Sequence, residues 1–99
     1  MRQKKVPNRN RVPILSARNI GPQCAAEIEA MGIRYLDEIE KLGWEEFCIR
    51  YVEHFPHRLN LNAFAAVIGA LEDRDWREID SNLKLAARQL IRRIKSGRY

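Results

Sequence analysis

The segment from residue 61 to residue 72 constrains the fold more than any other part of this sequence. Apolar side chains lie on almost every side of this segment when it is drawn as a helix, namely Leu61, Phe64, Val67, Ile68, Leu71 and four alanines. A helix without a polar face is normally covered by neighbouring elements. We therefore expect this helix to form the centre of the core, with Asn60 as its N-cap.

The rest of the chain predicts further short helices separated by proline and glycine. Apolar residues recur with the helical period, and no stretch alternates convincingly like a strand. Pro13 and Pro22 suit first helical positions, Gly32 suits a left-handed C-terminal cap, and Gly43 and Pro56 end helices. The expected helices span residues 13–18, 22–31, 33–42, 44–54, 61–72 and 81–96. The predicted fold class is all-α, a compact bundle of five to six short helices.

The length and composition of the chain indicate one domain. A chain of 99 residues is long enough for one core and too short for two. Residues 1–12 are polar, basic and interrupted by Pro7, so we expect a flexible basic arm followed by a single domain over 13–99. The apolar stretch 61–71 is too short for a membrane span, and no apolar run follows the first bases as in a secretory signal. Two distant cysteines without a CxxC pattern are typical of free thiols, and we expect a cytoplasmic protein.

Charge is distributed very unevenly along the chain. All 13 acids lie in residues 19–80, where six bases leave a net charge of −7. Residues 1–18 and 81–99 carry six bases each and no acid. Such asymmetry favours an anionic partner such as DNA for the basic ends. The alternative is that the ends are solvated or lie on the acidic middle of the chain.

The last expected helix carries a row of bases beside an apolar face. With a rotation of about 100° per residue, its apolar side chains occupy an arc of roughly 140°. Lys84, Arg88, Arg92 and Lys95 fall on the next arc, which is roughly 80° wide. Packing of the apolar face should leave these four residues, which we call the basic stripe, directed outward.

The turn Asn19-Ile20-Gly21-Pro22 is the most informative short motif. It resembles the turn of helix-hairpin-helix motifs, in which a hydrophobic residue stands between two glycines. We expect both glycine positions to need unusual backbone angles, and Asn19 stands at the first of them because asparagine tolerates a left-handed angle well.

The hairpin turn is also a candidate nucleic-acid contact. Free amides at the start of the following helix can hold a phosphate, which makes Arg18, Asn19 and Gly21 candidate contacts. The alternative is that these residues only fold the turn, because Pro22 lacks an N–H and Glu27 and Glu29 repel phosphate.

Further motifs follow the hairpin in a recognisable order. They are Met31-Gly32-Ile33, Leu36-Asp37-Glu38-Ile39, Leu42-Gly43, Leu61-Asn62, Gly69-Ala70-Leu71 and Trp76. Over about residues 14–80 the chain resembles the C-terminal domain of the TfoX family of bacterial competence regulators, also called Sxy. The resemblance implies an all-helical domain with a helix-hairpin-helix-like element. In long members of the family this domain follows a separate N-terminal domain, and the whole protein helps to switch on DNA-uptake genes beside a global transcription activator, so that role does not transfer directly to this domain. The chain departs from the family at Tyr35, usually a capping threonine, and at Ile68, usually a glutamate.

No pattern in the sequence predicts catalysis, a cofactor, a metal or a small-molecule substrate. His54 and His57 have no third ligand nearby and fall short of a zinc site, and no nucleophile–base pair or glycine-rich phosphate loop has a recognised spacing. We therefore expect a non-catalytic, nucleic-acid-associated regulatory or accessory domain that contacts the DNA backbone through its basic ends. The alternative is a protein–protein interaction module, for regulator docking or self-association, without direct DNA binding.

Overall fold

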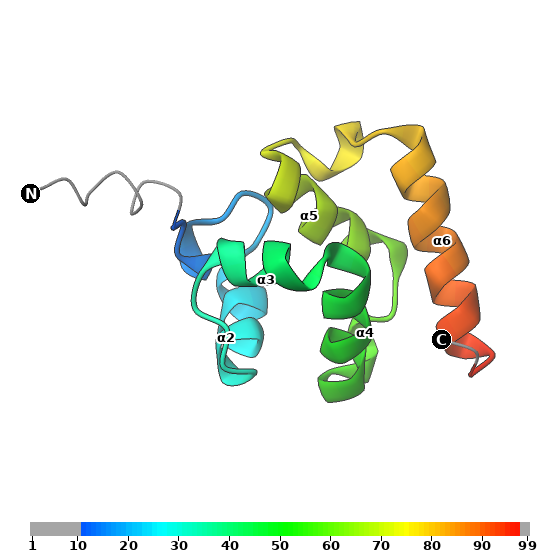
Figure 1. The fold of residues 1–99 in the computed structure, drawn as a ribbon, viewed down its shortest axis with the longest axis horizontal. Helices are drawn as coiled ribbons and strands as arrows, with labels where there is room; N and C mark the ends of the chain where they lie inside the picture. The colour runs from blue at the N-terminus through cyan, green and yellow to red at the C-terminus, as the bar shows by residue number, and fades with distance from the viewer. Residues whose placement is uncertain (1–10, 98–99) are drawn as a thin grey trace, which may run out of the picture.

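The computed structural model describes residues 11–97, and these residues form the predicted all-α fold (Figure 1). The elements in order are the 3-10 turn η1 (Ile14–Ser16), α2 (Pro22–Ala30), α3 (Leu36–Leu42), α4 (Trp44–His54), the 3-10 turn η2 (Pro56–Arg58), α5 (Leu61–Glu72), the 3-10 turn η3 (Trp76–Glu78) and α6 (Ser81–Lys95). Residues 1–10 of the expected basic arm lie outside the described residues.

The apolar helix α5 lies at the centre of the core, as predicted. It contacts α3, α4, α6 and η3, and half of its twelve residues are buried. Ile68 is only 2% exposed, so this departure from the family pattern adds to the core. The helix begins at the predicted cap, because the Ala63 amide donates to Asn60 Oδ1 at 2.8 Å.

Glycines end the helices at the two predicted positions. Gly32 has a φ of +89° after α2, where its amide donates to the Glu29 carbonyl at 2.9 Å. Gly43 has a φ of +86° between α3 and α4. Left-handed angles of this kind favour glycine, which explains why the chain turns at these points.

Two predicted helices are shorter in the structure than in the sequence analysis. The helix expected over 13–18 is the single 3-10 turn η1, and the helix expected over 33–42 begins at Leu36. The reason is a backbone pairing between the two segments, in which the Ile14 amide donates to the Arg34 carbonyl at 3.0 Å and the Leu36 amide to the Val12 carbonyl at 2.8 Å. Backbone groups used in this pairing are unavailable for helical hydrogen bonds.

Helix α6 packs on the edge of the core. Ala87 and Leu90 are buried, and the helix contacts α5 and α4. In Figure 1, α6 lies at the opposite end of the longest axis from η1.

Candidate nucleic-acid interface

The hairpin turn is held to the loop that follows α5 by one side chain. Asn19 has a φ of +70°, as expected for the first glycine position of the motif. Its Nδ2 donates to the Arg74 carbonyl at 2.6 Å, and its Oδ1 accepts from the Trp76 amide at 3.2 Å. Asn19 therefore bonds to backbone more than fifty residues away and is part of the fold.

A glycine of α5 makes room for this contact. A Cβ added to Gly69 would lie 2.6 Å from Asn19 Nδ2 and 2.7 Å from the Arg74 carbonyl oxygen. Such distances are too short for a side-chain carbon, so the close approach of the hairpin requires glycine at this position.

The second glycine position of the motif does not need glycine. Gly21 has a φ of −78° and a ψ of 176°, an extended conformation that any residue before a proline adopts readily. A Cβ at this position would meet no atom within 4 Å. The expectation of an unusual backbone angle at Gly21 is therefore wrong, because Asn19 alone supplies the left-handed residue of the turn.

Arg18 is also engaged within the protein. Its Nη1 donates to the Asp73 carbonyl at 3.0 Å and lies 3.9 Å from the Asp73 carboxylate. Arg18 and Asn19 thus share the loop after α5 as their partner, which supports the alternative that they fold the turn.

The basic stripe on α6 presents a different environment. Arg88, Arg92 and Lys95 are exposed, whereas Lys84 is half-buried and donates from Nζ to the Arg77 carbonyl at 3.0 Å. No member of the stripe forms an ion pair with any residue between 11 and 97.

Most described bases before α6 are, by contrast, neutralised by an acid. The residues that form ion pairs are Arg11, Arg18, Arg50, Arg58, Arg74 and Arg77. Acidic side chains consequently neutralise most of the positive charge between residue 11 and the start of α6, whereas the positive charge of α6 is not neutralised by any residue between 11 and 97. The hairpin approaches only the start of the stripe, because Asn19 accepts from the Trp76 amide of η3 and Lys84 donates to the Arg77 carbonyl of the same turn. The rest of α6 runs away from the hairpin (Figure 1).

A cluster around Glu27 is the feature that sequence reasoning missed. The Glu27 carboxylate accepts from Tyr51 Oη at 2.7 Å and from Arg58 Nε at 2.7 Å, and it lies 3.1 Å from His57 Nε2. The Arg58 guanidinium, with the hydrogen bonds from Tyr51 and His57, lowers the pKa of Glu27 to about 2 despite partial burial. These partners come from α4 and from η2, 24 to 31 residues away, so no local spacing indicated them.

The described residues contain no group of three or more His, Cys, Asp or Glu side chains arranged to hold a metal ion. Nor is any helix among them both long and apolar enough to cross a membrane.

Comparison with known proteins identifies the family. A search of curated proteins and a search of solved structures each gave no match. The family model of the TfoX C-terminal domain matches residues 10–90, which includes the hairpin turn and most of α6, while Arg92 and Lys95 lie beyond the matched residues. Because this match covers most of the 99 residues, the chain belongs to the TfoX C-terminal domain family.

Proposed function

We propose that this domain is a non-catalytic regulatory or accessory module, related to the bacterial competence regulators, that contacts the phosphate backbone of DNA through the basic stripe of α6. The observation that carries the proposal is that the stripe has no acid partner among the described residues, whereas six bases before α6 do. Uncompensated bases on one helix face are the electrostatic feature that attracts a polyanion.

The proposal assigns different roles to the two groups of residues predicted from sequence. Arg88, Arg92 and Lys95 are exposed and contact phosphates, with Lys84 at the start of the row. Arg18 and Asn19 hold the hairpin to the loop after α5, and the contact with DNA does not depend on them. Phosphate contacts position a protein on the duplex without reading its sequence, so we expect weak binding without base preference. The dissociation constant should be no better than about micromolar near physiological salt.

Filter binding of a DNA duplex at several salt concentrations tests this proposal. About four phosphate contacts for each stripe give a log–log salt slope of roughly −3.6 per stripe. The variant Arg88→Gln/Arg92→Gln should reduce the magnitude of that slope by about two, because two phosphate contacts are lost from each stripe. It should weaken binding to all sequences alike.

A matched control has the same loss of charge elsewhere. Arg50→Gln/Arg74→Gln removes two exposed arginines that are paired with Glu46 and Glu72, and it should leave the slope unchanged. Absence of duplex retention by the wild type at about 50 mM salt, where phosphate contacts are strongest, excludes the nucleic-acid role and favours the protein-interaction module.

A further inference from the structure

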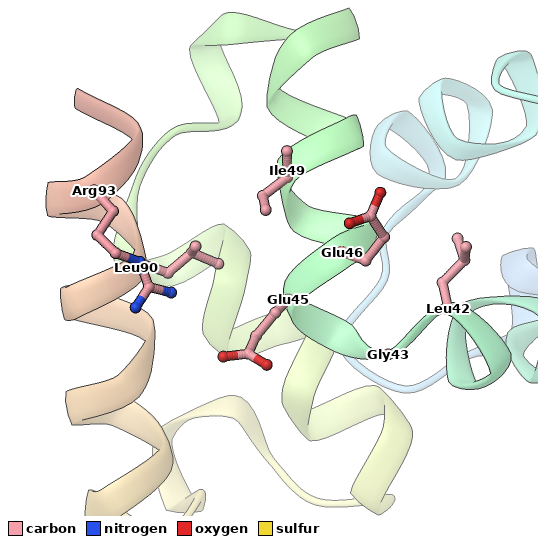
Figure 2. Close-up of a pocket in the computed structure, with 7 residues that line it drawn as sticks. All are labelled: Leu42, Gly43, Glu45, Glu46, Ile49, Leu90 and Arg93. Atoms are coloured by element: carbon pink, nitrogen blue, oxygen red, sulfur yellow. The ribbon is translucent and has the colours of Figure 1, made fainter. Parts of the chain in front are cut away.

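A groove of about 440 Å³ runs across α4, from Leu42 and Gly43 at the end of α3 to Leu90 and Arg93 on α6 (Figure 2). The partly buried Leu42 and Ile49 supply its apolar surface, with the fully buried Leu90 behind them, and Glu45, Glu46 and Arg93 supply its charged side chains. The two long helices that border the groove, α4 and α6, thus contribute an acidic wall and a basic wall.

Two of the charged groups in the groove have no partner. Figure 2 shows Glu45 and Arg93 extending from α4 and α6 toward the space between the helices, yet they form no ion pair with each other or with another described residue. Glu46 differs, because Arg50 donates to it at 2.8 Å. An unpaired acid and an unpaired base beside apolar side chains form a surface that a ligand with complementary charge can cover.

The flank of α6 next to this groove is also unpartnered. Leu85 is 50% exposed and is one of only two large hydrophobic residues so exposed in the described part of the chain. By helical rotation, Leu85 and Arg93 lie about 80° apart, on a flank between the basic stripe and the groove-facing Leu90. This flank therefore combines an exposed apolar side chain with the unpaired base.

We infer that the groove receives α6 of a second copy of this chain, in an antiparallel, two-fold symmetric dimer. Leu85 of each copy covers Ile49 of the other, and Arg93 of each copy faces Glu45 of the other. Because α6 is itself one wall of the groove, inserting it into the groove of the other copy makes the same contact twice and closes the assembly.

Charge complementarity is the argument for this occupant. The groove offers an unpaired carboxylate beside an apolar surface, and the α6 flank offers an unpaired guanidinium beside an exposed leucine. Leu85 and Arg93 are about 12 Å apart along the helix, which lets one helix contact the apolar surface and the acidic wall together. The basic stripe borders this flank, since Arg92 lies about 20° from Leu85 by helical rotation. The centre of the stripe lies about 100° from the centre of the flank, so the dimer leaves Lys84, Arg88 and Lys95 open to solvent.

Sedimentation equilibrium on the full chain, from micromolar to millimolar concentration, tests the inference. The wild type should associate to a dimer and no further. Leu85→Asp places a charge in the apolar contact and should weaken dimerisation at least about tenfold. Leu15→Asp is the matched control, because Leu15 is 62% exposed and belongs to η1, which lies at the opposite end of the longest axis from α6 (Figure 1), and it should dimerise like the wild type.

Charge exchange distinguishes this contact from a general loss of stability. Glu45→Arg and Arg93→Glu should each weaken the dimer, and the chain that carries both changes should regain association because the pairs are restored with their signs exchanged. A wild type that is monomeric throughout, an equal effect of Leu15→Asp, or no recovery in the double variant would overturn the inference. A further contrary result is a chain that no longer associates when residues 1–10 are deleted but still associates as Leu85→Asp. That result would assign the contact to the N-terminal residues and would refute the dimer through α6. No DNA is present, so the outcome is independent of the proposed DNA binding.

Discussion

Asn19 and Gly69 depend on each other although fifty residues separate them in the chain. The left-handed angle of Asn19 turns its amide group toward the loop after α5, and Gly69 leaves the space in which that group bonds to Arg74 and Trp76. Asparagine is used at this position for its side chain as well as for its backbone angle. Gly21, by contrast, has an extended conformation that any residue can adopt, so this position does not require glycine.

Alanine substitution should therefore destabilise the domain at Gly69 and have almost no effect on its stability at Gly21. Gly69→Ala places a carbon 2.7 Å from a backbone carbonyl and should lower the free energy of unfolding by about 1–3 kcal/mol. Gly21→Ala has open space and should change that free energy by less than about 0.5 kcal/mol. Urea unfolding of both variants measures the difference. Equal destabilisation would contradict the assignment of the hairpin contact to Gly69.

Glu27 makes the stability of the domain sensitive to acid. Its pKa is lowered from 4.5 to about 2 in the folded chain, so its contribution is complete above pH 4.5 and is lost as the pH falls toward 2. The side chain is 11% exposed, and the shift corresponds to about 3 kcal/mol at most. Unfolding followed from neutral pH into the acid range should show this loss, and Glu27→Gln should be less stable at neutral pH with a flatter acid dependence. Glu40→Gln, which removes an exposed carboxylate that has no ion-pair partner among residues 11–97, is the control and should keep the wild-type dependence.

At the scale of the elements, helices whose ends are marked by local cap, proline or glycine residues could be predicted from the sequence. Backbone pairings between segments distant in the chain could not. Asn60 and the apolar period placed α5 at its observed first residue, and Pro22 placed α2. The errors at η1 and at the start of α3 have one cause, the pairing of residues 12–14 with residues 34–36. Tyr35, the second departure from the family pattern, takes part in this pairing through an antiparallel bridge with Pro13. The centroid of its ring also lies 4.1 Å from the Arg11 guanidinium carbon.

Truncation at the N-terminus should show where the folded body begins. Deleting residues 1–10 removes few apolar groups and should cost well under about 1 kcal/mol. Deleting residues 1–12 also removes Arg11, which is 3.2 Å from Asp37, and the Val12 carbonyl that accepts from Leu36, and it should cost about 1–2 kcal/mol more. Thermal unfolding of the two truncated chains gives the comparison. A large loss in the shorter deletion would mean that residues before Arg11 also contact the body.

At the scale of the whole molecule, the separation of charge seen in the sequence has a structural counterpart. Bases of the acidic middle such as Arg50, Arg58, Arg74 and Arg77 are bound by neighbouring acids, while the bases of α6 have no such partner in the described chain. The stripe was predictable because it follows from helical rotation alone. The roles of Arg18 and Asn19 were not, because their partners lie 55 to 57 residues further along the chain.

The proposed dimer and the proposed DNA contact together make a prediction that neither makes alone. The basic stripe is centred about 100° from the centre of the Leu85–Arg93 flank. In an antiparallel pair of α6 helices that meet along this flank, the two-fold axis is perpendicular to both helices, and both stripes therefore face the same side. A dimer then presents about eight bases to one duplex, and its log–log salt slope should be roughly −7.

The neutral substitution Leu85→Gln tests this coupling without altering the charge of the stripe. Filter binding by the variant should show the slope of a single stripe, roughly −3.6, and so should the wild type when it is diluted below the dissociation constant of the dimer. Leu15→Gln serves as the control and should retain the steeper slope, since Leu15 belongs to η1, at the opposite end of the longest axis from α6 (Figure 1). Equal slopes for the wild type and Leu85→Gln at high protein concentration would show that the two stripes do not bind one duplex together. The reason is that the slope counts the counterions released in one binding event, and a dimer bound through both stripes releases about twice as many as a single stripe.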